Sequence, residues 1–369
     1  MPSHRPAQPI SARAIRFLVA LSGLAILSGC SATAPVAWNP GVARQASNWY
    51  RSAQARGIAD SVLQYQSAEG GWPKNTDLAK APRTAADIPS DGKENTFDND
   101  GTTLPMEFLA RVVHATGARV YRDAFNRGLD YTLAAQYPNG GWPQFYPLRS
   151  GYYSHITFND DAMIRVMSLL RDIASGKPPY EFVDDVRRER AAQAVARGID
   201  LILRTQIKQN GFLTAWCAQY DERTLEPAWA RRYEPPSLSG SESVGILRFL
   251  MSIEAPTPQI VAAIEGGVRW LRQSAIVGIR LERFTSDDGL ADKRVMAESA
   301  AETLWARFYE LGSNRPIFLG RDSVFRYNFA EIERERRTGY GYYGTWPRRL
   351  LDEDYPAWKR ELPLQPRRS

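Results

Sequence analysis

Apolar residues recur at three- and four-residue spacing through much of this chain, which is the period of an amphipathic helix. In the segment 190–206, for example, Val195, Ile199 and Ile202 fall on one face. Alternation of apolar and polar residues, which would indicate half-buried strands, is scarce. The periodicity predicts helices over residues 53–66, 104–116, 125–136, 162–174, 190–206, 244–253, 260–274 and 297–311. The pattern therefore predicts an all-α fold.

Several of these segments lead into similar sequences. Gln66 is followed by Gly-Trp72-Pro and Gln136 by Gly-Gly-Trp142-Pro, so that the two Trp residues lie 70 positions apart. A fainter third copy, 206–212, begins a further 70 positions along. Self-similarity at a fixed period indicates repeated units that bury their apolar faces against one another. Three helical hairpins repeated around an axis predict a toroid with long irregular loops on one rim.

The N-terminal segment has the pattern of a bacterial export signal. Three Arg residues precede the apolar run 17–27, which is too short to span a membrane, and Leu-Ser-Gly-Cys30 follows. Leu-Ser-Gly-Cys resembles a lipobox, in which the Cys is lipidated and becomes the mature N-terminus, whereas an ordinary cleavable signal is the alternative. We therefore expect a signal peptide at 1–30, a linker at 31–42 and a catalytic domain at 43–369. Ser31 favours anchoring in the outer membrane, outside the cytoplasm.

The charge balance excludes one class of partner. The formal net charge is +6, and removal of the signal peptide leaves 44 basic and 41 acidic residues, or +3. Proteins that bind nucleic acid usually show a concentrated basic face, so no nucleic-acid partner is expected. Cys217 has no disulfide partner if Cys30 is lipidated, and we expect it to be a small buried apolar residue. We expect a monomer.

Two short sequences rich in Asp and Asn, 96–102 and 157–162, stand at the starts of predicted helices. Carboxylate and amide oxygens are the ligands that Ca²⁺ prefers, and two such clusters on one rim could share an ion. Helix N-capping is the structural alternative, since Asp and Asn are common N-caps. The duplicated clusters carry more carboxylates than capping can use, so Asp98 and Asp160 are candidates for metal or substrate contact. Asn99 is a weaker candidate, and the remaining Asp100 and Asp161 are assigned structural roles.

A long segment without periodicity, 214–243, concentrates charged and aromatic residues, which is typical of a site rather than a scaffold. It contains Arg231 and Arg232, and an Arg side chain has a planar fork that matches a carboxylate. Exposed Arg pairs are more often simply solvated. Cationic and aromatic residues also interleave through 305–346, and this mixture suits an acidic oligosaccharide. The substrate-contact candidates are Arg307, Arg321, Trp72 and Trp142.

Other catalytic arrangements find little support in the sequence. No Gly-x-Ser-x-Gly motif or phosphate-binding Gly loop occurs, and His155 is assigned a structural role. The Gln-x4-Gly-Trp repeats are similar to those of triterpene cyclases, but the Asp-x-Asp-Asp acid of those enzymes is missing. Asp98 and Asp160 could instead be the paired carboxylates of a glycoside hydrolase, in which case no double bond would form in the product. A non-catalytic lipoprotein that binds acidic glycans is a further alternative.

Taken together, the motifs resemble the pectate lyases of polysaccharide lyase family 10. The resemblance spans nearly the whole mature chain. It rests on Gly-Gly-Trp-Pro at Gly70 and Asn-Gly-Gly-Trp-Pro at Asn139, Thr-x-Asp-Asn at Thr96, Phe-Asn-Asp-Asp-Ala-Met at Phe158, Thr-Ala-Trp-Cys at Thr214, Ala-Arg-x-Tyr-Glu at Ala230, Gly-Arg-Asp at Gly320 and Glu-Arg-Arg-x-Gly-Tyr at Glu335.

This resemblance implies an (α/α)3 toroid that cleaves polygalacturonate by Ca²⁺-assisted β-elimination to 4,5-unsaturated oligogalacturonides. It implies roles by motif: Arg231 as the base that removes the C5 proton, Asp98, Asn99 and Asp160 as the Ca²⁺ site, and Arg307 and Arg321 as contacts to substrate carboxylates or to the transition state. An Arg base is unusual, because a guanidinium is normally protonated. The sequence departs from the family pattern at Gly101, where Ala is more usual, and Arg232 beside Arg231 leaves the identity of the base open.

Overall fold

The computed structural model describes Met1, residues 36–90 and residues 92–362. The expected signal peptide and Cys30 therefore lie outside the described residues. The chain divides into Met1–Val36 and a compact unit that begins at Ala37. Within that unit, Val42 at the end of the expected linker is already buried in a short 3-10 helix. In the described part of the chain, no helix combines the length and apolar character needed to cross a membrane.

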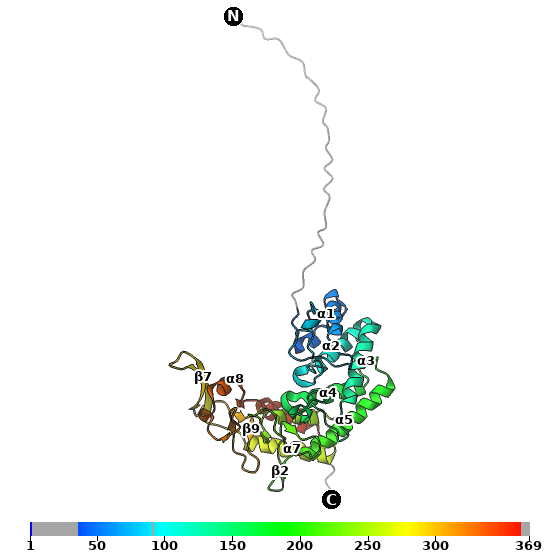
Figure 1. The fold of residues 1–369 in the computed structure, drawn as a ribbon. Helices are drawn as coiled ribbons and strands as arrows, with labels where there is room; N and C mark the ends of the chain where they lie inside the picture. The colour runs from blue at the N-terminus through cyan, green and yellow to red at the C-terminus, as the bar shows by residue number, and fades with distance from the viewer. Residues whose placement is uncertain (2–35, 91, 363–369) are drawn as a thin grey trace. The chain divides into compact units, whose positions relative to one another are not determined.

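Seven helices form two layers in the first two thirds of the compact unit (Figure 1). One layer is a row in which α2, α4 and α6 contact one another in turn, and the other is a row of α1, α3, α5 and α7. Hydroxyl or carboxylate N-caps begin several of them, as where Ser52 accepts a hydrogen bond from Ala55 N and Thr257 from Ile260 N. Their bounds are α1 Ala53–Gln64, α2 Thr103–Thr116, α3 Arg119–Ala134, α4 Ala162–Ala174, α5 Asp185–Thr205, α6 Glu242–Met251 and α7 Pro258–Gln273.

The repeat appears in the structure as one contact made four times. A buried indole donates a hydrogen bond to a carbonyl in the last turn of α1, α3, α5 and α7 in turn. The pairs are Trp72–Val62 at 2.9 Å, Trp142–Thr132 at 2.9 Å, Trp216–Ile202 at 2.8 Å and Trp305–Leu271 at 2.7 Å. The sequence placed Phe212 in the third copy, but Phe212 is 61% exposed and Trp216 takes the position instead. The fourth copy was not predicted.

The prediction of an all-α fold is wrong, because the described residues also form six two-stranded antiparallel sheets. Helix was expected over 297–311, yet Trp305 and Phe308 lie in strands and are buried there. Pairing with distant strands therefore overrides the local helical pattern. The pairs are β1 Ile156–Thr157 with β4 Gln219–Tyr220, β2 Lys208–Gln209 with β3 Phe212–Leu213, β5 Leu238–Ser239 with β9 Phe308–Tyr309, β6 Ile279–Thr285 with β7 Ala291–Ala297, β8 Trp305–Ala306 with β12 Tyr343–Gly344, and β10 Phe318–Leu319 with β11 Phe325–Arg326.

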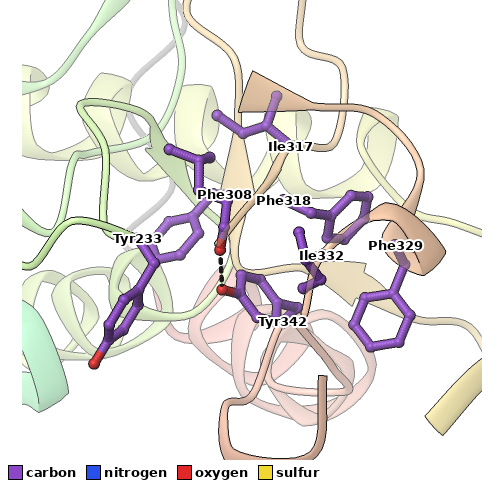
Figure 2. Close-up of a cluster of buried hydrophobic side chains, with 8 residues drawn as sticks. Tyr233, Phe308, Ile317, Phe318, Phe329, Ile332 and Tyr342 are labelled. Atoms are coloured by element: carbon purple, nitrogen blue, oxygen red, sulfur yellow. Dashed lines mark hydrogen bonds between the residues drawn. The ribbon is translucent and has the colours of Figure 1, made fainter. Parts of the chain in front are cut away.

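The C-terminal third has an aromatic core of its own (Figure 2). It brings Tyr233 from the long loop together with Phe308 and Phe318 of the strands and with Tyr342, whose hydroxyl donates to Leu319 O. This core holds the loop of Arg231 against the β8–β9 segment, in which Arg307 lies between the two strands. The remaining helices are α8 Arg334–Gly339, α9 Pro347–Arg349 and α10 Tyr355–Glu361, with a π-helix at Leu350–Asp354 and 3-10 turns at Pro40–Arg44, Ser47–Arg51, Ala85–Asp87, Asp98–Asp100, Tyr152–Ser154, Asn159–Asp161 and Phe329–Glu331.

Candidate active site

The two acidic clusters form matching 3-10 turns, Asp98–Asp100 and Asn159–Asp161, just ahead of α2 and α4. In each turn the last two residues have a left-handed backbone, with φ of 48° and 61° in the first turn and of 50° and 60° in the second. Asn and Asp adopt this conformation more readily than most other residues, which explains the residue types. By backbone conformation, Asn99 therefore corresponds to Asp160, and the buried Asp98 corresponds to Asn159.

Helix capping does not account for these carboxylates. Thr102 and Asp161 are the N-cap residues of α2 and α4, and neither side chain makes a capping hydrogen bond. Instead the two turns share a hollow of about 410 Å³, lined by Asn99, Asp100, Asp160, Asp161, Arg165, Ser241 and Glu242. Burial and the nearby Glu242 carboxylate raise the pKa of Asp161 to about 6. The hollow is therefore rich in carboxylates, and Arg165, which pairs with Asp100 at 2.8 Å, is the one cation in its lining.

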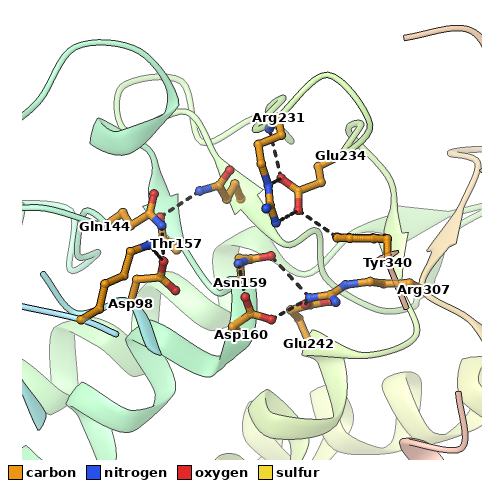
Figure 3. A network of polar contacts seen from close by, with 12 residues as sticks. Asp98, Gln144, Thr157, Asn159, Asp160, Arg231, Glu234, Glu242, Arg307 and Tyr340 are labelled. Carbon is orange, nitrogen blue, oxygen red and sulfur yellow. Dashed lines mark hydrogen bonds and ion pairs between the residues drawn. The ribbon is translucent and has the colours of Figure 1, made fainter. Parts of the chain in front are cut away.

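Asp98, in the first of these turns, is buried and is held from two sides (Figure 3). Its Oδ2 forms an ion pair with Lys74 and accepts a hydrogen bond of 2.7 Å from Gln144 Nε2. Its Oδ1 is buried and has no partner among the described residues. Lys74 and Gln144 occupy the same position after Trp-Pro in the first and second repeats, so both repeats supply a donor to one carboxylate.

Arg307 connects the acidic hollow to the C-terminal strands. It lies between β8 and β9, and its Nη2 forms an ion pair with the buried Glu242 and a second one with Asp160 at 2.9 Å. Burial lowers the pKa of Arg307, but the charges of Glu242 and Asp160 outweigh it and hold the pKa well above the ordinary value. Burial raises the pKa of Asp160, but Arg307, Asn159 and Arg231 lower it by more, so that the pKa lies below its ordinary value. Asp160 is therefore ionised.

Arg231 lies on the opposite side of the Tyr340 ring from Arg307 (Figure 3). Its guanidinium carbon is 5.7 Å from the Tyr340 centroid, and that of Arg307 is 5.2 Å from it. Arg231 Nε and Nη2 donate to both oxygens of Glu234, at 2.7 and 2.5 Å, and Tyr340 OH donates to the same carboxylate at 2.8 Å. Burial lowers the pKa of Arg231, but the bonds to Glu234 outweigh it and raise the pKa above its ordinary value. Arg231 and Arg232 are both exposed, but in the described part of the chain no hydrogen bond or ion pair joins Arg232 to Glu234 or Tyr340.

Arg321 is the most exposed of the three predicted arginines. It makes two hydrogen bonds to Glu335, of 3.1 and 3.0 Å, and its guanidinium carbon is 5.9 Å from the ring of Tyr233. Arg231 lies 5.1 Å from the same ring. The structure thus brings together Asp160, Arg307, Arg231 and Arg321 through two tyrosines, with Asp98 and Asn99 in the adjoining turn.

The predicted sugar contacts of Trp72 and Trp142 are contradicted by their burial. The side chains are 0% and 1% exposed, and each indole hydrogen-bonds a helix end. A buried ring has no free face for a sugar, so these residues stabilise the repeats instead. Cys217 is buried and free, as expected.

Sequence reasoning missed Glu242, Tyr340, Glu234 and Lys74. Glu242 is the first residue of α6 and follows β5, Leu238–Ser239, but no Asn or Asp cluster marks this place in the sequence as it does the other two turns. A separate group, His155, Asp221 and Glu222, has ligand atoms within 4.8 Å of one another, where His155 Nδ1 lies 3.1 Å from Glu222 Oε2. The predicted metal residues do not belong to this group.

Comparison with known proteins identifies the class. A model of the pectic acid lyase family matches residues 66–351. A solved family 10 polysaccharide lyase from Cellvibrio cellulosa is 37% identical over 85% of this chain and 96% of its own, with a TM-score of 0.73. A mutant family 10 polysaccharide lyase from Cellvibrio cellulosa, in complex with trigalacturonic acid, is 36% identical over 86% of this chain and 98% of its own, with a TM-score of 0.72. No curated protein matches.

The chain therefore belongs to the pectic acid lyase family, and it is a pectate lyase, an enzyme of the polysaccharide lyase class.

Proposed function

We propose that this enzyme cleaves polygalacturonate by Ca²⁺-assisted β-elimination at the junction of the acidic hollow and the arginines. The observation that carries the proposal is the placement of ionised Asp160 against Arg307, with Arg231 across the Tyr340 ring. A uronate substrate needs cations for its carboxylates and a stabiliser for the charge that develops when a proton leaves C5. The complex of a related lyase with trigalacturonic acid supports this substrate class.

We assign the Ca²⁺ site to Asp98, Asn99 and Asp160. The unpartnered buried Oδ1 of Asp98 supports this assignment, since a buried carboxylate oxygen without a donor is costly unless a cation meets it. All three residues offer oxygen ligands, as Ca²⁺ requires, whereas the His155 group includes an imidazole and suits Ca²⁺ less well. When bound, Ca²⁺ would neutralise a substrate carboxylate and so make the neighbouring C5 proton more acidic.

In the proposed reaction the C5–H bond and the C4–O bond break, a C4=C5 double bond forms, and the departing oxygen takes up a proton. Arg231 is the proposed proton acceptor, because it is in the polar network whereas Arg232 is not. Arg307 and Arg321 are assigned to substrate carboxylates.

We also infer that the mature protein is a lipid-anchored monomer outside the cytoplasm, held at Cys30 in the outer membrane. The lipid anchor is inferred from the sequence before Cys30, and the outer membrane from Ser31 directly after it. Labelling with a radioactive fatty acid, compared between the full-length protein and Cys30→Ala, would test it.

The catalytic proposal is tested with mature protein and polygalacturonate. We expect ultraviolet absorbance from the new double bond, its loss in excess chelator, and its recovery when Ca²⁺ is added back. Arg231→Ala should abolish the absorbance while circular dichroism stays unchanged, and Arg232→Ala is the matched control that should retain it. Reducing ends without a double bond would indicate a glycoside hydrolase instead. Binding of the polymer without any product would indicate a non-catalytic glycan-binding protein.

A further inference from the structure

We propose that Arg283 and Lys293, on the β6–β7 hairpin, form an additional binding site for uronate carboxylates beyond the cleavage centre. The proposal rests on the proposed substrate, polygalacturonate. The two residues are direct cross-strand partners in the antiparallel pair of β6 and β7. We therefore expect them to affect the affinity for a long polymer and not the rate of the cleavage step.

Like charges directly opposite each other in a sheet are unfavourable. Among the described residues, neither Arg283 nor Lys293 has an ion pair with a carboxylate, and the Lys293 ammonium donates to Thr338 O at 3.0 Å. Arg283 lies directly across the sheet from Lys293, and its charge adds to the effect of burial in lowering the pKa of Lys293. An anion from outside the chain would relieve this repulsion.

The opposite face of the same hairpin is different. Arg294 is the cross-strand partner of Glu282 and donates to it at 2.6 Å, and Arg280 donates to Glu282 at 2.9 Å. The cations there are neutralised within the hairpin. The unpaired cations are therefore confined to one face, which argues against a general excess of surface charge.

That face adjoins the aromatic core of the C-terminal third. Side chains alternate along a strand, so Leu281 lies on the same face as Arg283. Leu281 packs against the aromatic core that includes Tyr233 and Tyr340, the two rings on which the catalytic arginines stack. Lys293 reaches the carbonyl of Thr338 in α8, beside which β7 lies (Figure 1). The cationic pair thus continues the series of arginines outward along the hairpin.

A polymer with one carboxylate on each sugar could contact both sets of cations at once. The partly exposed position implies a modest contribution from each charge. For Arg283→Gln combined with Lys293→Gln we expect polygalacturonate binding to weaken about threefold to tenfold, as for two partly exposed charge contacts. Binding of fully methyl-esterified pectin should not change, because its carboxylates carry no charge.

The experiment measures polymer binding by affinity electrophoresis and KM and kcat by product absorbance. The matched control is Arg294→Gln, which removes one cation from the opposite face of the same hairpin. We expect a higher KM for the polymer, an unchanged kcat and a smaller effect on trigalacturonate. Thermal stability of the double variant should be equal or higher, because the repulsion is removed, whereas a purely structural role would lower it.

Equal binding and equal KM in the double variant and the wild type would overturn the inference, as would the same loss in Arg294→Gln. The binding measurement does not depend on turnover. If the wild type forms no unsaturated product but the double variant still binds the polymer more weakly, the proposed reaction fails and the inference about the hairpin stands.

Discussion

Replacement of Arg307 by Ala should destabilise the protein strongly, because it leaves the carboxylate of Glu242 buried without its cation. The Glu242 side chain is 1% exposed and that of Arg307 is 12% exposed, so solvent screens their ion pair little. Removing one partner of a buried pair costs about 3–5 kcal/mol. The second partner, Asp160, is 42% exposed, and losing that contact adds at most about 1 kcal/mol. The free energy of unfolding should therefore fall by about 3–5 kcal/mol in Arg307→Ala.

Urea denaturation followed by circular dichroism, in buffer with chelator, measures this change without interference from bound metal. The double variant Arg307→Ala with Glu242→Gln should recover a large part of the loss, because an amide is less costly to bury than an unpaired carboxylate. Arg248→Ala is the surface control, since its pair with Asp354 is partly exposed and should contribute less than about 1 kcal/mol. A loss below 1 kcal/mol in Arg307→Ala, or a double variant no more stable than the single one, would refute this reasoning.

Two further predictions concern the scaffold. Trp216→Ala should cost about 3–5 kcal/mol of unfolding free energy, because it leaves a buried cavity, whereas the exposed Phe212→Ala should change it by less than about 0.5 kcal/mol; equal effects in urea denaturation would contradict the assigned third repeat. Hydrogen bonds from Arg337 hold the pKa of Asp292 below its ordinary value of 3.8, so this carboxylate stabilises the fold above that pH and loses its contribution as pH falls through the lower pKa. Asp292→Asn should therefore melt below the wild type at pH 7 and approach it below about pH 4, and a gap that stays constant with pH would exclude the ion pair as its cause.

Local patterns predicted the helices well where an apolar stripe repeats over three or more turns. The segment 162–174 coincides with α4, Ala162–Ala174, and its buried face includes Met163, Val166 and Leu170. The segment 297–311 failed because its apolar residues are buried by strands from elsewhere in the chain: Trp305 faces Gly344, and Phe308 faces Ser239. The spacing of apolar residues within one segment carries no information about which distant strands will pair with it.

Part of the candidate site could be predicted from the sequence, because some of its positions have a backbone conformation that only a few residue types adopt readily. The left-handed positions of both turns favour Asn and Asp, and this made Asn99 and Asp160 visible as a duplicated motif. Glu242 was missed because its role depends on Arg307, which lies 65 positions away. The same holds for Tyr340, whose contact with Glu234 joins residues 106 positions apart. Pairings of this kind are set by tertiary structure and leave no local pattern.

The pairing of Arg231 with Glu234 bears directly on how an arginine could accept a proton. With Glu234 bonded to two of its nitrogens, the pKa of Arg231 is raised, and the guanidinium is held in its protonated form. Tyr340 OH also donates to Glu234, so the carboxylate has a second donor and need not depend on Arg231 alone. Positive charge beside Asp160 would oppose the effect of Glu234, since Asp160 and Arg231 are close enough for their charges to interact. Whether Arg231 accepts a proton therefore depends on two opposing effects on its pKa. Glu234 raises the pKa, and the positive charge of Arg307 beside Asp160 would lower it.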